Sequence, residues 1–345
     1  MGLRSYVITR ILLTIPTLLL LLTMVFLVMR VLPGDPVALH FEKKADPWQV
    51  ENMRQKLGLD KPLLTQYADY VLGLIDVNYF LAHGFPNFGK SMSNFDEVGG
   101  QIFSVFPATL ELAIYSMIIA SVTGILLGVV ASKSYNSVLD QLIRGLGTVT
   151  YAVPVFFLGI VFQLIFGVYL HWFPTSLRIH PSVPPPATMT GLFTVDSLLQ
   201  GNVIAFFESV KALLLPSLTL GIVLSGIFVR LTRTNMLETL RLDFVTAAKA
   251  RGLSEDTVTY GYALRNAFLP VLTMMGLQFA ALLGGAVLTE KTFSWPGLGG
   301  YILDRISSRD YTAIQGAVTM FGLVVALVSL AVDLLYAYFD PRIRL

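Results

Sequence analysis

The chain has no cysteine among its 345 residues, and only 13% of its residues are charged. Without cysteine, disulfide frameworks, thiolate metal sites and a cysteine nucleophile are excluded. The charged fraction is about half that of an average soluble protein. Lys and Arg number 24 against 22 Asp and Glu, which is too small an excess for a nucleic-acid-binding surface. Because 54% of the residues are hydrophobic, soluble domains of this length could not bury them all, and a polytopic membrane protein is indicated.

Six apolar stretches are long enough to cross about 30 Å of hydrocarbon, which requires about 20 helical residues each. They lie at residues 9–30, 108–131, 149–170, 212–230, 269–289 and 313–336. The first is longer than a secretory signal and lacks a cleavage site of small residues, so we predict that it is retained as a membrane helix. The predicted fold class is therefore all-α, a polytopic membrane protein with six transmembrane helices.

Basic residues are distributed unevenly between the segments that connect the spans. If the N-terminus is cytoplasmic, the cytoplasmic segments carry Lys and Arg at about twice the density of the outer loops. Six of the 24 basic residues lie between Arg230 and Arg265. The positive-inside rule therefore predicts that both termini are cytoplasmic, which agrees with an even number of spans.

We expect a single transmembrane domain over residues 1–345. Three longer polar segments interrupt it: a first outer loop, a second outer loop and a cytoplasmic loop, at about 33–107, 171–211 and 231–268.

The first outer loop begins with a turn at residues 33–36, Pro-Gly-Asp-Pro. Two short amphipathic helices are predicted after it, at about 47–57 and 62–75. Asp46 and Pro47 are typical of the N-cap and the first position of the earlier helix.

Residues 84–91 read Gly-Phe-Pro-Asn-Phe-Gly-Lys-Ser and match the phosphate-binding pattern G-x-x-x-x-G-K-[ST] letter for letter. A working P-loop lies between a buried strand and a helix whose backbone N–H groups hold phosphate. Here the preceding residues do not form a continuous buried strand, and the following residues are polar and turn-rich. The segment is also predicted to lie outside the cell, so we interpret the match as a coincidence.

Groups with catalytic or metal-binding character are few. The four histidines lie in outer loops at no metal-ligand spacing, and no Ser-His-Asp set or carboxylate pair shares a plausible cleft. Glu111, Glu290 and Asp333 lie at or just inside membrane boundaries, where we interpret them as snorkelling or as paired near the headgroups, Asp333 with the basic tail. Gly124 and Gly128 form a small-xxx-small face that permits close helix packing. We therefore predict no catalytic residue and no metal site.

The most structured polar segment connects the fourth and fifth apolar stretches. Asp243 can cap a short helix over residues 244–251, which Gly252 ends in the left-handed conformation. Ser254 can cap a second helix over about 255–266.

On the first of these helices Phe244, Ala247, Ala248 and Arg251 share one face. Small alanines beside one aromatic residue and one arginine suit docking into a groove on another protein. The alternative is an ordinary loop helix resting on the membrane surface. In either case the helix is too short to be stable without tertiary support.

This cytoplasmic loop closely resembles the coupling loop of peptide-importing ABC permeases. The resemblance rests on Asp243-Phe244-Val245-Thr246-Ala247-Ala248-Lys249-Ala250-Arg251-Gly252-Leu253 and on Ala263-Leu264-Arg265-Asn266-Ala267-Phe268-Leu269-Pro270. Further matches along about 300 residues include Ile15-Pro16-Thr17, Ala108-Thr109-Leu110-Glu111-Leu112, Phe293-Ser294-Trp295-Pro296-Gly297 and Asp340-Pro341-Arg342. Thr246 stands where the family often has Glu, and the spacing from Gly252 to Pro270 exceeds the general permease pattern.

The resemblance implies a type I ABC-importer-like transmembrane domain in the cell membrane, forming half of a translocation path for dipeptides or oligopeptides. The residues that it assigns to ATPase coupling are Asp243, Phe244, Thr246, Ala247, Ala248, Arg251, Gly252 and Leu253. The implied partners are a second homologous permease, two cytoplasmic ABC ATPases, an extracytoplasmic solute-binding protein and the lipid bilayer. ATP and Mg would be bound by the ATPases, so we expect no cofactor in this chain and no enzymatic activity of its own.

Two kinds of alternative remain at the level of the sequence. Within the family, the solute could be nickel or an oligosaccharide. Outside it, an ion-coupled secondary transporter should show carboxylates at mid-membrane depth or paired Gly/Pro-broken helices in inverted halves. An intramembrane enzyme should show polar groups that face each other inside the bundle. The sequence shows none of these features.

Overall fold

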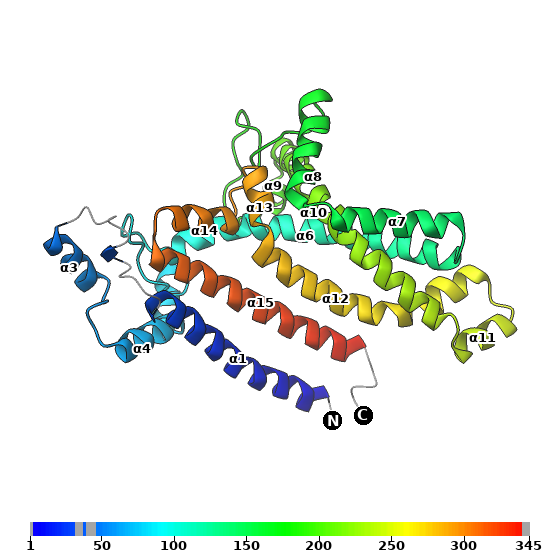
Figure 1. Cartoon of the computed structure of the whole chain (residues 1–345), viewed down its shortest axis with the longest axis horizontal. Coiled ribbons are helices and arrows are strands. Elements are labelled where there is room, and N and C mark those ends of the chain that lie inside the picture. Colours follow the sequence, from blue (N-terminus) through cyan, green and yellow to red (C-terminus); the bar gives the residue numbers. More distant parts are fainter. Residues whose placement is uncertain (1–2, 32–36, 39–45, 340–345) are drawn as a thin grey trace.

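A computed structural model of the chain describes residues 3–31, 37–38 and 46–339 (Figure 1). Within this part the chain forms helices joined by turns and loops, and the only β pairing is one isolated antiparallel bridge between Lys90 and Glu97. The predicted all-α fold class is confirmed. The turn expected at 33–36, His40 and the basic tail at 340–345 lie outside the described residues.

The helices follow one another from the N-terminus to the C-terminus, two of them in the wider π form (η). They are α1 (Leu3–Val31), α3 (Pro47–Lys56), α4 (Leu63–Leu74), α5 (Val77–His83), α6 (Val98–Lys133), α7 (Val138–Ala152), α8 (Val155–Phe162), η1 (Gln163–Tyr169), α9 (Phe193–Leu199), α10 (Val203–Thr239), α11 (Asp243–Ala250), η2 (Thr257–Ala263), α12 (Leu264–Gly285), α13 (Val287–Thr292), α14 (Leu298–Ser307) and α15 (Tyr311–Phe339).

Five helices of the described chain are long and apolar enough to cross a membrane singly: α1, α6, α10, η2 with α12, and α15. In the region of the third predicted span, the structure differs from the prediction. α7 and the α8–η1 segment meet the same criterion only as a pair, and they are bent by 100°. The prediction of one continuous helix over 149–170 is therefore wrong. Pro154 lacks a backbone N–H and favours an extended conformation at Val153, whose φ is −77° and ψ 128°, so α7 ends there.

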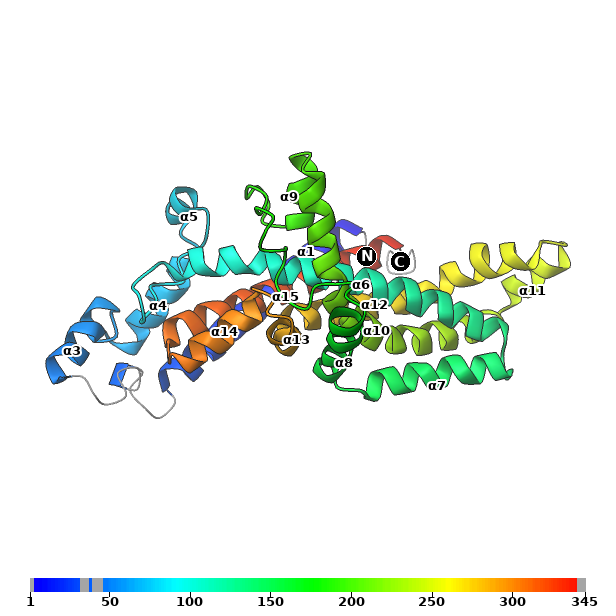
Figure 2. The same ribbon diagram turned by 90° about the horizontal axis from the view of Figure 1, so that it is seen from above.

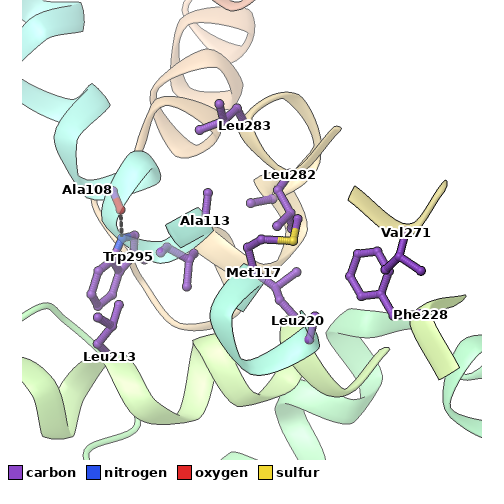
Figure 3. Packing of buried hydrophobic residues seen from close by; sticks show 13 residues of the cluster. Ala108, Ala113, Met117, Leu213, Leu220, Phe228, Val271, Leu282, Leu283 and Trp295 are labelled. Carbon is purple, nitrogen blue, oxygen red and sulfur yellow. Dashed lines mark hydrogen bonds between the residues drawn. The ribbon is translucent and has the colours of Figure 1, made fainter. Parts of the chain in front are cut away.

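The two longest helices, α6 and α10, form the centre of the bundle. In the most apolar part of α10, 72% of the residues are buried within the chain, against 11% in α1. Figure 3 shows the core beside this pair, where Met117 of α6 and Leu220 of α10 pack together and Trp295 donates a 2.8 Å hydrogen bond to the carbonyl of Ala108. α10 is therefore the most deeply buried span and packs against α6, α7 and α12, whereas α1 packs mainly on α15.

Glycines of α6 bring the α6 and α10 backbones close together, as the small-xxx-small face predicted. A Cβ atom added at Gly124 would lie 2.4 Å from Cβ of Phe228, and one at Gly128 would lie 2.6 Å from Cβ of Thr232. Real side chains do not tolerate such contacts, so glycine is required at both positions.

Gly124→Ala should lower the free energy of unfolding by about 1–3 kcal/mol, because the new methyl group overpacks this contact. Thermal unfolding of the purified protein measures the change. Gly145→Ala in α7 is the matched control, since its Cβ would meet no described atom within 4 Å. The control should gain up to about 1 kcal/mol from the higher helix propensity of alanine. Equal effects of the two substitutions would contradict the close packing.

The beginning of α1 and the end of α15 lie side by side, with both described termini on the same side of the bundle (Figure 1). Arg10 of α1 and Asp333 of α15 form an ion pair of 3.2 Å. Asp333 is therefore paired, as the sequence suggested, and its partner within the described residues is Arg10 of the first helix. The expected pairing with the basic tail lies outside the described residues. α11 lies at one end of the elongated molecule and α3 to α5 lie at the other (Figure 2).

The outer elements agree with the sequence in their local structure. α3 and α4 match the two predicted helices, and Asp46 is the N-cap residue of α3. The segment 84–91 is preceded by α5 rather than by a strand, so it is not a P-loop. Its Ser91 hydroxyl donates a 2.5 Å hydrogen bond to Asp310, which also accepts from the backbone N–H of Met92 at 3.0 Å. This segment thus attaches the first outer loop to the beginning of α15.

Candidate functional site

The predicted coupling helix, α11, begins one residue earlier than expected and lies beyond the end of α10 (Figures 1 and 2). Leu242, whose backbone is extended, is the N-cap residue, so the prediction that Asp243 caps the helix is wrong. Asp243 instead lies in the first turn, where its negative charge is favourable to the helix dipole. Gly252 has a φ of +78°, which confirms the left-handed end, and the N–H of Leu253 donates to the carbonyl of Ala248 at 3.4 Å.

α11 packs on its own chain through one narrow apolar face. Val245 and Ala248 are buried against Val258 of η2, with Leu240 beside them. Ala248 thus does not lie on the exposed strip with Phe244, Ala247 and Arg251, because a spacing of three or four residues defines a face without determining which edge turns inward. Its assignment to coupling stays a prediction. The other predicted coupling residues remain on the surface: Asp243, Phe244, Thr246, Ala247, Arg251, Gly252 and Leu253.

The chain after α11 returns directly into the membrane bundle. Ser254 accepts a 3.3 Å hydrogen bond from the backbone N–H of Thr257, as a capping residue does. The helix that follows was predicted to stop near Asn266, but it continues through η2 into α12. The loop between membrane helices is thus shorter than the predicted 231–268, since residues 231–239 also belong to α10. α11 is thus joined to α10 and to the helix that begins near Glu255 by short turns at 240–242 and 251–254.

A second contact joins the coupling loop to the end of α6. Lys133 forms a 3.1 Å ion pair with Asp256, and its ammonium lies 5.7 Å from the ring centre of Tyr260. Both ion-pair partners are partly or largely exposed, so the pair by itself stabilises little. Its position is structurally important, because it connects the residues after Gly252 to α6, one of the two central helices.

A buried ion pair joins α7 to α10 at the same end of the molecule. Asp140 is fully buried and accepts hydrogen bonds from Nε and Nη2 of Arg233 at 2.6 and 2.7 Å. The backbone N–H of Asn136 donates to it at 3.1 Å, and Arg144 lies 3.7 Å away. Such a bidentate geometry fixes the relative orientation of two helices. Sequence reasoning did not find this pair, because its members are 93 residues apart.

Arg233→Gln should lower the free energy of unfolding by about 1–3 kcal/mol, because Asp140 loses its bidentate partner while remaining buried. Arg144→Gln is the matched control: the same carboxylate loses a more distant and half-exposed arginine, and the expected loss is about 0–1 kcal/mol. Thermal unfolding of both variants measures the difference. A larger loss for Arg144→Gln would show that Arg233 is not the principal partner.

The bent pair formed by α7 and the α8–η1 segment connects α7 to α13 and to the second outer loop. After Pro154, α8 packs on α13, where Gly159 allows the ring of Phe293 to approach. Nε2 of Gln163 in η1 donates to the carbonyls of Thr175 and Thr292 at 2.7 and 2.9 Å. α7, α8 and the second outer loop are thus connected to the end of α13.

The second outer loop is attached to α6 by a buried ion pair. Arg178 and Glu111 are only 7% and 2% exposed, and their closest atoms are 2.5 Å apart. Thr194 donates to the same carboxylate from its backbone N–H at 2.8 Å and from its hydroxyl at 2.7 Å. The guanidinium carbon also lies 3.7 Å from the ring centre of Phe193. Burial lowers the pKa of Arg178, and the charge of Glu111 opposes that shift. Glu111 is therefore paired inside the protein and does not snorkel to the headgroups.

Glu290 has a comparable structural role on α13. Its carboxylate accepts a 2.6 Å hydrogen bond from the hydroxyl of Thr109 and a 2.9 Å bond from the backbone N–H of Gly300. Burial raises the pKa of this carboxyl, and these hydrogen bonds oppose the shift. Since Gly300 lies in the first turn of α14, Glu290 connects that helix N-terminus to α6. Glu290 does not snorkel to the headgroups, because its side chain is buried within the protein.

The described residues contain no group of three or more His, Asp or Glu side chains placed to hold a metal ion. The charged side chains described above make structural pairs between helices. They therefore fix the positions of these helices and loops relative to one another.

Comparisons with known proteins agree with this architecture. The family described as "Binding-protein-dependent transport system inner membrane component" matches residues 124–345, and the N-terminal part of such membrane components matches residues 3–113. The fold resembles that of a chain from inward-facing MetNI, a methionine ABC transporter, with a TM-score of 0.52 and 13% identity. That likeness covers 68% of this chain and 93% of the other, and it concerns the fold alone.

Curated relatives extend over nearly the whole chain. The Di/tripeptide transport system permease protein DppB of Pseudomonas aeruginosa is 39% identical over 343 residues, which is 99% of this chain and 98% of the relative. The Dipeptide transport system permease protein DppB of Escherichia coli is 36% identical with the same coverage. The Glutathione transport system permease protein GsiC of Salmonella typhimurium is 37% identical over 340 residues, 99% of each chain. The chain therefore belongs to the family of inner-membrane components of binding-protein-dependent transport systems, as a multi-pass membrane permease subunit of the ABC type.

Proposed function

We propose that the chain is one of two related permease subunits of an ATP-driven importer of short peptides. An external binding protein delivers the peptide, and two cytoplasmic ATPases bind ATP and Mg and dock on α11. The relatives named for dipeptides, tripeptides and glutathione support the peptide as solute. No observation favours nickel, an oligosaccharide or ion-coupled transport over this assignment.

The observation that supports the docking role most directly is the exposed surface of α11. Phe244, Ala247 and Arg251 lie on one surface strip that the helix does not use for its own packing. An aromatic residue and an arginine are typical anchors of protein interfaces, and the small alanine between them permits close approach. Leu253 adds a second apolar side chain just beyond Gly252.

The same geometry supports a path for the mechanical signal. Closure of the ATPases would displace α11, which moves η2 through Val245 and Val258. The pair of Arg233 with Asp140 carries the displacement from α10 to α7. A transporter of this kind needs two arrangements of its helices whose relative populations depend on both ATP and the loaded binding protein.

We also propose that the α11 end is cytoplasmic, together with both termini. The basic residues between Arg230 and Arg265 support this orientation under the positive-inside rule. Arg10 and Asp333 pair α1 with α15, so the orientation of one of these helices determines that of the other.

Transport by the assembled system tests the proposal. The chain is purified with its partner permease and ATPases, reconstituted in liposomes and supplied with the binding protein and labelled dialanine. We expect accumulation that requires both ATP and the binding protein and that excess nickel or oligosaccharide does not compete. Uptake that an ion gradient drives without the ATPases would contradict the assignment, and competition by nickel would change the solute.

A further inference from the structure

A cavity of about 490 Å³ lies at the outer end of the molecule, far from α11. The end of α1, the turn between α3 and α4, α4 itself, residues 87–90 and the beginning of α15 surround it. Its volume is in the range typical of small-molecule sites. None of the contacts described for coupling or for helix packing uses it.

Three residues of the cavity lining each have one buried side-chain polar atom with no hydrogen-bond partner within the described part of the chain. These atoms are Nε of Arg30, Oε1 of Gln66 and Oε1 of Gln315. Gln315 is only 4% exposed. Buried polar groups in proteins are almost always paired with protein, water or ligand, so three such atoms around one cavity call for a common partner. One of the three is a cationic donor and two are neutral acceptors.

The charges of the cavity lining leave an excess of positive charge. Asp69 is paired with Lys61 at 2.7 Å. Glu97 is paired with Lys90 at 3.9 Å and accepts a hydrogen bond from Tyr79. Both carboxylates are therefore paired with lysines of the same chain.

Two basic side chains of the lining, Arg30 and Lys56, contact no described carboxylate. Arg30 lies 5.9 Å from the ring centre of Phe26, and the Lys56 ammonium lies 5.5 Å from that of Phe95. The cavity thus offers two cations to an anionic group, and two amide oxygens to N–H donors.

We propose that this cavity binds a small zwitterion, a molecule that carries a carboxylate and an ammonium group, as a short peptide does. The carboxylate lies toward Arg30 and Lys56, and the N–H donors lie toward Gln66 and Gln315. A purely anionic ligand would leave both amide oxygens without a donor. The choice of a peptide among zwitterions rests on the proposed function. With a peptide as ligand, the cavity is an outer binding site in the permease itself, separate from that of the binding protein.

Binding to the complete transporter without its binding protein tests this proposal. The complex is placed in nanodiscs of phosphatidylcholine, and binding of labelled dialanine is measured by equilibrium dialysis. N-acetyl-dialanine and dialanine amide probe the two ends of the peptide, and glycerol phosphate probes a headgroup-like phosphate. We expect dialanine to bind and each blocked analogue to bind at least about tenfold more weakly, since one charge-assisted hydrogen bond accounts for that factor.

Two substitutions should weaken dialanine binding by about tenfold or more: Arg30→Gln, which removes the cation, and Gln315→Leu, which removes an acceptor at nearly constant volume. Lys291→Gln is the control, because it removes an exposed outer cation that does not line the cavity. Thermal unfolding of each variant shows whether the protein remains folded. If Arg30→Gln unfolds the protein, the effect of Gln315→Leu on dialanine binding alone tests the proposal.

The possible results separate this proposal from the proposed function. No dialanine binding, equal binding of the blocked analogues, or preference for glycerol phosphate would overturn the zwitterion site, whereas peptide import by the full system would remain as evidence for the function. Conversely, dialanine binding that depends on Arg30 and Gln315, without ATP-driven uptake, would support the cavity and contradict the proposed function.

Discussion

Ala247→Glu should leave the protein inserted in the membrane and abolish the coupling of ATP hydrolysis to transport. Ala247 is exposed on α11, between Phe244 and Arg251, and makes no part of the helix's own packing. Glutamate at this position should therefore not destabilise the chain. At a docked interface, however, it would place an unpaired charge against the partner, which costs several kcal/mol and weakens docking by more than about a hundredfold.

The measurement is peptide-stimulated ATP hydrolysis and uptake by the reconstituted complex, with membrane insertion checked separately. Lys249→Glu serves as the control, because Lys249 is exposed on the opposite flank of the same helix, away from Phe244 and Arg251. It should retain most of the coupled activity. Normal transport by Ala247→Glu would show that α11 is not the docking helix.

Gly252→Val should have the same phenotype for a different reason. A Cβ atom at Gly252 would meet no described atom within 4 Å, so steric contact is not the cause. A β-branched residue in this conformation, with a φ of +78°, is strained by about 1–3 kcal/mol. Relief of that strain would change the turn that orients Leu253. Gly252→Asn should be nearly silent in the same assay, because asparagine tolerates this conformation.

Arg178→Met should lower the free energy of unfolding by about 3–5 kcal/mol. The substitution leaves the carboxylate of Glu111 buried without its cation, at a position where Glu111 is 2% exposed. It also releases the second outer loop from α6, because Arg178 additionally donates to the carbonyl of Gly191 at 2.9 Å. Thermal unfolding of the purified protein measures the loss.

Two further variants identify the buried charge as the cause. Lys291→Met removes a cation from an exposed outer ion pair with Asp304 and should cost about 0–1 kcal/mol. Adding Glu111→Gln to Arg178→Met should recover part of the stability, because glutamine is neutral and can still accept from Thr194. If Arg178→Met and Lys291→Met are equally mild, the buried pair has no special role.

Local features of the chain could be predicted well from the sequence. Gly252 ends α11 in the left-handed conformation, Ser254 caps the following helix, and Asp46 precedes α3 as its N-cap residue. Gly124 and Gly128 mediate the predicted close helix packing. Each of these depends on residues within one or two helical turns, so the pattern contains the necessary information.

The features that could not be predicted depend on distant residues or on a choice that a pattern leaves open. Glu111 and Arg178 are 67 residues apart, and nothing local indicates that they meet. Pro154 lies in an otherwise apolar run, and hydropathy alone does not distinguish a straight span from one bent by 100°. The docking face was predicted with Ala248 included, because periodicity does not show that Val245 is the residue that turns inward.

The central claim is that α11 is where the ATPases dock, and one labelling measurement tests it most directly. Because the chain contains no cysteine, Ala247→Cys introduces a single thiol into it. Its rate of alkylation is compared between the complete transporter and the permease pair stripped of its ATPases, with Leu64→Cys as the control at an exposed position of α4. The account predicts strong protection of residue 247 by the ATPases and no protection of residue 64. Equal labelling of residue 247 with and without the ATPases would contradict it.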